Sequence, residues 1–174
     1  MVDWKKFNSL VSMDLAAFRV KFSVRHFLLN DMVKFYIYLR LLECCKVKTG
    51  TFYKLSRWRF GAVAKKLGFS IPIGVIGPGL RLPHYGTIVI NTKAKIGSNC
   101  HINVGVVIGS NVKDRTKAPI IGDNCYIGAG AKIIGNVVLG DNVVVGANAV
   151  VTKSFPDGNC SLVGIPANVL ENRC

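Results

Sequence analysis

The side chains best suited to acid–base chemistry in this chain are its three histidines, because imidazole exchanges a proton close to neutral pH. They are His26, His84 and His101. His26 lies among basic residues with no catalytic neighbour, which indicates a surface side chain. His84 stands beside Tyr85 and Gly86, where it is either a catalytic base or a buried structural residue. His101 is predicted to point outward and is the reserve candidate.

The six cysteines show no spacing typical of a zinc site, and the sequence predicts no metal. Cys100 and Cys125 fall at small, inward positions of the repeat described below. A buried thiol has a raised pKa and is a poor nucleophile, so an acyl-enzyme route through either cysteine is disfavoured. Buried thiols also favour a reducing compartment.

A six-residue repeat contains His101 and begins just after His84. Gly or Asn, the residues that most readily accept a left-handed backbone, stands three places after eight of its ten aliphatic residues. This position holds Asn99, Gly105, Asn111, Asn124, Gly130, Asn136, Asn142 and Asn148. The aliphatic residues are Ile90, Ile96, Ile102 and Ile108, then Ile121, Ile127, Ile133, Leu139, Val145 and Val151. A period of six fits neither an α-helix nor an alternating strand, and it predicts a parallel β-helix.

Charge divides the chain into residues 1–70 and 71–174. The first part has fourteen Lys and Arg against four acids, a net charge of +10, whereas the second has a net charge of +4. Aromatic residues at helical spacing, and an apolar run from Val33 to Leu42, predict two to four helices in the first part. Their apolar faces would pack on the domain, lie on a membrane surface or, least favoured, bind nucleic acid. We expect no secretory signal and no membrane-spanning segment.

The repeat is interrupted once, between Ile108 and Ile121, where the step is thirteen residues. Residues 110–119 must therefore leave the coil as an exposed, basic loop. Insertions in repeat proteins gather on the binding face, so this loop is expected near the functional site.

Four stretches of the second part are in register with the repeat: the His84–Ile90 segment, Val106–Gly109, Ile127–Asn136, and the closing Gly164–Ala167. In these stretches the chain resembles the serine acetyltransferase branch of the hexapeptide-repeat acyltransferases. The resemblance covers roughly residues 71–170. The resemblance implies a left-handed β-helix that forms homotrimers, with active sites between subunits, and that transfers acetyl from acetyl-CoA to a hydroxyl.

The resemblance also assigns roles to individual residues. His84 corresponds to the catalytic base, with Tyr85 beside the acceptor. Backbone N–H groups of Gly105 or Gly109 could stabilise the oxyanion. Gly109, Ala129 and Ala147 would contact the CoA arm, while Lys132 or Lys153 would offer positive charge to its phosphates.

Three departures from this branch bear on the acceptor. Pro83, Thr116 and Ser70 stand where the branch carries, respectively, an acid that helps hold the amino acid, a second His, and an acid that orients the catalytic His. An α-ammonium group is hard to bind without carboxylates, which disfavours free serine as the acceptor. With these departures the chain is more similar to the serine-acetyltransferase-like enzymes that acetylate sugars in capsule and colanic-acid pathways. That resemblance implies a sugar or surface-polysaccharide precursor as the acceptor. The alternatives are a serine O-acetyltransferase of cysteine synthesis and a non-enzymatic scaffold. A cytoplasmic location is expected, with residues 1–70 able to contact the inner face of the membrane.

Overall fold

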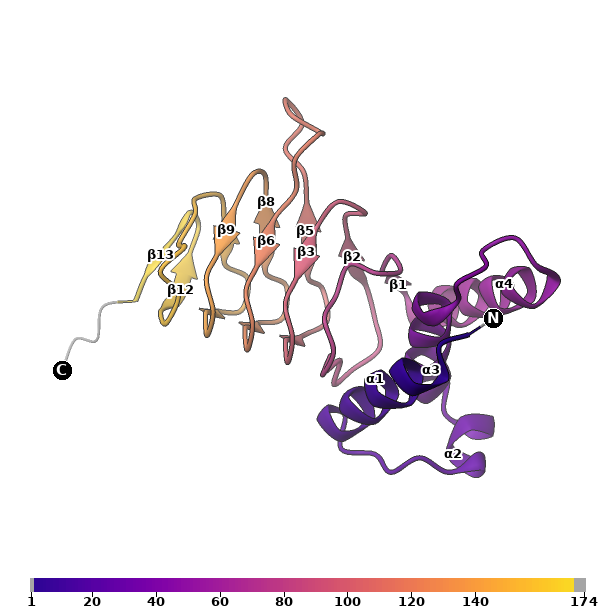
Figure 1. Cartoon of the computed structure of the whole chain (residues 1–174). Coiled ribbons are helices and arrows are strands. Elements are labelled where there is room, and N and C mark those ends of the chain that lie inside the picture. The colour runs from indigo at the N-terminus through magenta and orange to yellow at the C-terminus, as the bar shows by residue number, and fades with distance from the viewer. Residues whose placement is uncertain (1, 171–174) are drawn as a thin grey trace.

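The computed structural model describes residues 2–170, which form a helical region followed by a prism-shaped coil (Figure 1). The helices are α1 (Trp4–Ala17), α2 (Val24–Leu29), α3 (Asp31–Cys44) and α4 (Thr51–Leu67). Four helices agree with the upper end of the expected number. Within residues 2–170 no helix is both long and apolar enough to cross a bilayer.

The α3 helix is the centre of the helical region and packs against the other three helices. Its start is fixed by the Asn30 side chain, which accepts hydrogen bonds from the N–H groups of Met32 and Val33. Residues around most of its circumference are buried, which explains why its sequence is almost wholly apolar. Gly68, in a left-handed conformation, ends α4 and turns the chain into the coil.

Short strands form the three flat faces of the coil. They are β1 (Phe69–Ser70), β2 (Ile88–Ile90), β3 (Lys95–Ile96), β4 (His101–Ile102), β5 (Val107–Gly109), β6 (Ile120–Ile121), β7 (Tyr126–Ile127), β8 (Lys132–Ile134), β9 (Val138–Leu139), β10 (Val144–Val145), β11 (Val150–Val151), β12 (Ser161–Gly164) and β13 (Ala167–Val169). The sheets have the orders β1-β2-β5-β8-β11, β13-β12-β10-β7-β4 and β3-β6-β9. All pairs are parallel except β12 with β13.

The predicted inward positions form the core. Every aliphatic residue of the six-residue repeat is buried, and Cys100 and Cys125 are buried between them. Positive φ angles occur at the corner residues Asn99, Gly105, Asn124, Gly130, Asn142 and Asn148. The expectation was wrong at two positions, because Asn111 opens the loop and Gly135, not Asn136, takes the left-handed conformation. The loop 110–119 projects from the coil as predicted (Figure 1).

Candidate active site

Most of the predicted site residues lie along one edge of the prism-shaped coil. This edge, here called the His84 edge, consists of the turns 83–87, 103–106, 128–131 and 146–149. Each turn is hydrogen-bonded to the next. The Gly105 N–H donates to the Thr87 carbonyl at 2.7 Å, and the Asn148 N–H donates to the Ala129 carbonyl at 2.8 Å. The fold therefore stacks His84, Tyr85, Gly105, Ala129 and Ala147 along a single line.

His84 lies in the first turn of this edge, next to the helical region, and is exposed to solvent. The flanking Tyr85 is 73% exposed. The alternative of a buried structural histidine is therefore wrong, because the turn at 83–87 holds the ring outside the aliphatic column. An exposed imidazole at a corner can receive a proton from a substrate that approaches from outside.

Small residues line the edge below His84. Ala129 and Ala147 are both exposed. The coils approach closely here, since a Cβ on Gly128 would come within 2.7 Å of the Ala147 nitrogen. The Gly-Ala-Gly-Ala sequence thus produces a flat, narrow edge where an extended ligand can lie against backbone.

Lys132 places a positive charge on the same edge. Its ammonium group donates to the Gly105 carbonyl at 2.8 Å and to the Gly130 carbonyl at 2.6 Å. The lysine therefore braces two consecutive turns. The Gly105 N–H is already engaged with Thr87, so this amide is not free to stabilise an oxyanion.

His101 lies on β4, at the outward position that its sequence context predicts. Its ring meets Tyr126 edge-on, with ring centroids 4.7 Å apart. Among the described residues, its buried Nε2 has no hydrogen-bond partner. Burial lowers the pKa of His101, and electrostatic interaction with Arg81 and His84 lowers it further. His101 is therefore neutral at pH 7.

Gly109, Lys153 and the loop 110–119 lie on a different edge of the same chain. Gly109 ends β5, and Lys153 follows β11 at an exposed position. The sheet β1-β2-β5-β8-β11 separates this edge from the His84 edge. One chain therefore does not bring all the predicted site residues together.

The three departures noted in the sequence occupy different places. Ser70 is exposed in β1, where it pairs with Val89. Pro83 precedes His84 directly. Thr116 lies in the loop, and its N–H donates to the Asp114 carboxylate at 2.9 Å. Among the described residues, no group of three His, Cys, Asp or Glu side chains could hold a metal ion.

Comparison with known proteins identifies the coil. Residues 118–153 match the bacterial transferase hexapeptide model, which comprises six repeats. The matched residues lie within the coil, from the end of the loop to the turn after β11. The predicted fold class, a left-handed parallel β-helix with an N-terminal helical extension, is confirmed.

The similar proteins are serine acetyltransferases. The enzyme of Synechococcus elongatus is 38% identical over 96 residues, which cover 55% of this chain and 39% of that protein. The enzyme of Staphylococcus xylosus is 42% identical over 101 residues, which cover 58% and 46%. The structure of soybean serine acetyltransferase complexed with serine has a TM-score of 0.78 and 29% identity, and covers 95% of this chain and 70% of that one. This hexapeptide-repeat chain matches less than half the length of the two sequence relatives.

These relatives overturn the expected sugar acceptor. That expectation rested on the three positions Pro83, Thr116 and Ser70, whereas the similarity to serine acetyltransferases extends over 101 residues. The comparisons support neither a sugar acceptor nor contact with a membrane. The serine-acetyltransferase alternative is the better-supported interpretation.

Proposed function

We propose that this chain is an acetyl-CoA-dependent O-acetyltransferase that acts on L-serine in the cytoplasm, with His84 as its general base. The observation that carries the proposal is the exposed position of His84 on an edge of the coil, in a chain that is 42% identical over 101 residues to the serine acetyltransferase of Staphylococcus xylosus. The soybean relative was solved in complex with serine, and its fold covers 95% of this chain.

In the proposed reaction, the His84 imidazole takes the proton of the serine hydroxyl as the oxygen attacks the thioester carbonyl. A C–O bond forms, and the C–S bond of acetyl-CoA then breaks. The proton passes from His84 to the departing sulfur, which gives O-acetylserine and free CoA. No metal takes part in this scheme.

The acetyl-CoA arm is proposed to lie along the His84 edge, over Ala129 and Ala147. The Lys132 ammonium next to Gly105 contributes positive charge where the oxyanion develops. Lys153 is proposed to attract the CoA phosphates.

Homotrimer formation would resolve the separation of the two edges. Gly109, Lys153 and the loop 110–119 of one subunit would face the His84 edge of its neighbour, so that each active site lies between subunits. The flat outer sheets of the coil are suited to such packing. His101, on one of these sheets, would then lie near the boundary.

The proposal is tested by measuring free thiol release from acetyl-CoA with L-serine, for the wild-type chain and for His84→Ala. Loss of the base is expected to lower kcat by roughly 10²–10⁴-fold. His26→Ala is the control, since His26 is exposed on α2, outside the coil, and its Nδ1 pairs with the Lys21 carbonyl at 2.9 Å. Absence of turnover in the wild type would contradict the proposal and favour the scaffold alternative.

A further inference from the structure

We propose that the helical region is a positioning frame for His84, in which Tyr36 and the end of α4 hold the two ends of segment 82–86. This inference rests on the proposed function, since it concerns the same general base. It gives the helices α1 to α4, which precede the coil, a role in setting the active site.

The frame makes two backbone hydrogen bonds, one on each side of His84. The Leu82 N–H donates to the Tyr36 hydroxyl at 2.8 Å. The Gly86 N–H donates to the Leu67 carbonyl, at the last residue of α4, also at 2.8 Å. His84 lies midway, two residues from each tether.

The Tyr36 tether is rigid because its ring is completely buried. The ring packs against Phe18 and Phe35, with centroid distances of 5.4 and 6.1 Å. Burial raises the pKa of Tyr36, so the hydroxyl stays neutral and continues to accept the Leu82 N–H. Leu82 is itself fully buried, so water cannot replace this bond at low cost.

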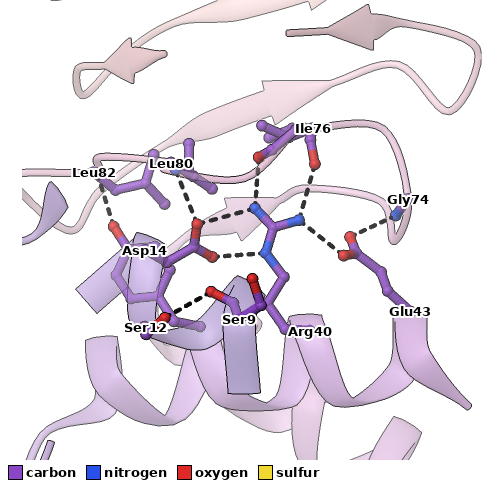
Figure 2. A network of polar contacts seen from close by, with 11 residues as sticks. Ser9, Ser12, Asp14, Arg40, Glu43, Gly74, Ile76, Leu80 and Leu82 are labelled. Atoms are coloured by element: carbon purple, nitrogen blue, oxygen red, sulfur yellow. Dashed lines mark hydrogen bonds and ion pairs between the residues drawn. The ribbon is translucent and has the colours of Figure 1, made fainter. Parts of the chain in front are cut away.

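A buried ion pair fixes the segment immediately before the Tyr36 tether (Figure 2). Asp14, from α1, accepts hydrogen bonds from Arg40 Nε at 2.6 Å and from the Leu80 N–H at 3.0 Å. Arg40, from α3, donates to the Ile76 and Gly77 carbonyls at 2.9 and 2.6 Å. The helical region therefore holds the chain from Ile76 to Leu82 before it reaches His84.

The second tether closes a turn that leaves little freedom. Gly86 has a φ angle of 136°, and a Cβ there would lie 2.5 Å from Val104 Cγ2. The turn must therefore sit directly on the next coil. Ser70 stands where the serine acetyltransferase branch carries an acid that orients the catalytic His. In this chain the fixed backbone of segment 82–86 places the imidazole instead. General-base catalysis depends steeply on such placement.

The test compares Tyr36→Phe with Tyr38→Phe. Tyr36→Phe removes one acceptor and keeps the ring, and kcat is expected to fall roughly 10-fold to 100-fold. KM for serine and acetyl-CoA should stay within about twofold, because neither binding surface is altered. Tyr38 lies on the same helix but contacts Phe27, 6.1 Å away between centroids, so Tyr38→Phe should leave kcat unchanged.

Two activity-independent measurements separate this inference from the proposed function. In Tyr36→Phe, the rate of amide hydrogen exchange in peptides spanning residues 80–87 should increase. The rate of carbethoxylation of His84, measured relative to that of His26, should change by roughly threefold. If the wild type fails to acetylate serine but both changes occur, the frame stands and the proposed function falls. Unchanged exchange and modification, or an unchanged kcat in an active enzyme, would overturn the inference.

Discussion

At the scale of single residues, His84 and His101 differ in what surrounds their rings. His84 is exposed at a corner, whereas His101 is half-buried against Tyr126. The pKa of His101 is lowered first by burial and then by electrostatic interaction with Arg81 and with His84. His101 is therefore held as a neutral imidazole, able to accept a hydrogen bond from a group that reaches its covered nitrogen.

Replacing Arg81 should shift this equilibrium. Arg81→Gln removes one positive charge, and the pKa of His101 should rise towards the ordinary value of 6.5 while staying below it, because burial acts in the same direction and persists. Titration of the histidine ring signals by NMR measures the midpoint. Lys153→Gln, on another edge, is the control and should leave the midpoint where it was. A midpoint that does not move in Arg81→Gln would mean that the arginine charge is screened.

The sequence predicted the inward residues and the outward ring of His101 because a six-residue period fixes which side chains face the column. It could not predict the Tyr36 tether. Tyr36 and Leu82 are 46 residues apart, and an aromatic residue in an apolar helix indicates only a packed face. The hydrogen bond of the Gly105 N–H could not be predicted for a related reason. Corner glycines look alike in sequence whether or not their N–H groups donate to a neighbouring coil.

At the scale of elements, the Asp14–Arg40 pair joins α1 and α3 to the first coil. Both side chains are almost completely buried, at 0% and 1% exposure. Breaking a buried pair leaves an uncompensated charge, which costs about 3–5 kcal/mol. Arg40→Met should therefore lower the free energy of unfolding by about that amount in urea denaturation.

The exposed Lys66–Asp31 ion pair provides the matched control. The Lys66 side chain is 72% exposed, so Lys66→Met should change the free energy of unfolding by less than about 1 kcal/mol. Equal effects of the two substitutions would show that the buried pair contributes no more than a surface one.

The helices and the coil differ in how far sequence specifies them. The thirteen-residue step between Ile108 and Ile121 located the loop because a strict period makes any insertion visible. The bounds of α3 are predicted less well, since the apolar run 33–42 omits Asp31 and Met32 after the Asn30 cap, and Glu43 and Cys44 at the end of the helix. Asn136 was misassigned because Gly135 beside it takes the positive φ at lower steric cost.

At the scale of the whole molecule, the sheet β13-β12-β10-β7-β4 presents an apolar outer face. Tyr126, Val144 and Val163 are each about two-fifths exposed, on strands β7, β10 and β12. We expect light scattering to give three times the 18.9 kDa chain mass. Val144→Lys should shift the population to smaller species, because a charge on this face would be buried without a partner.

Ser9→Lys is the control for this experiment, since Ser9 is exposed on α1 and lies outside the coil. A monomeric wild type would contradict the trimer. A trimer that Val144→Lys leaves intact would place the subunit boundary on another sheet.

Both ends of the coil are covered. At one end α4 runs directly into β1, and at the other the antiparallel strand β13 follows the last parallel pairing (Figure 1). A stack of parallel strands with open ends is a template on which further copies can add by the same hydrogen bonds. The antiparallel direction of β13 presents the wrong bonding pattern to an incoming coil, and the helices block the opposite end sterically. These terminal elements therefore limit growth along the coil axis and protect the protein from forming fibres, whatever reaction its edge performs.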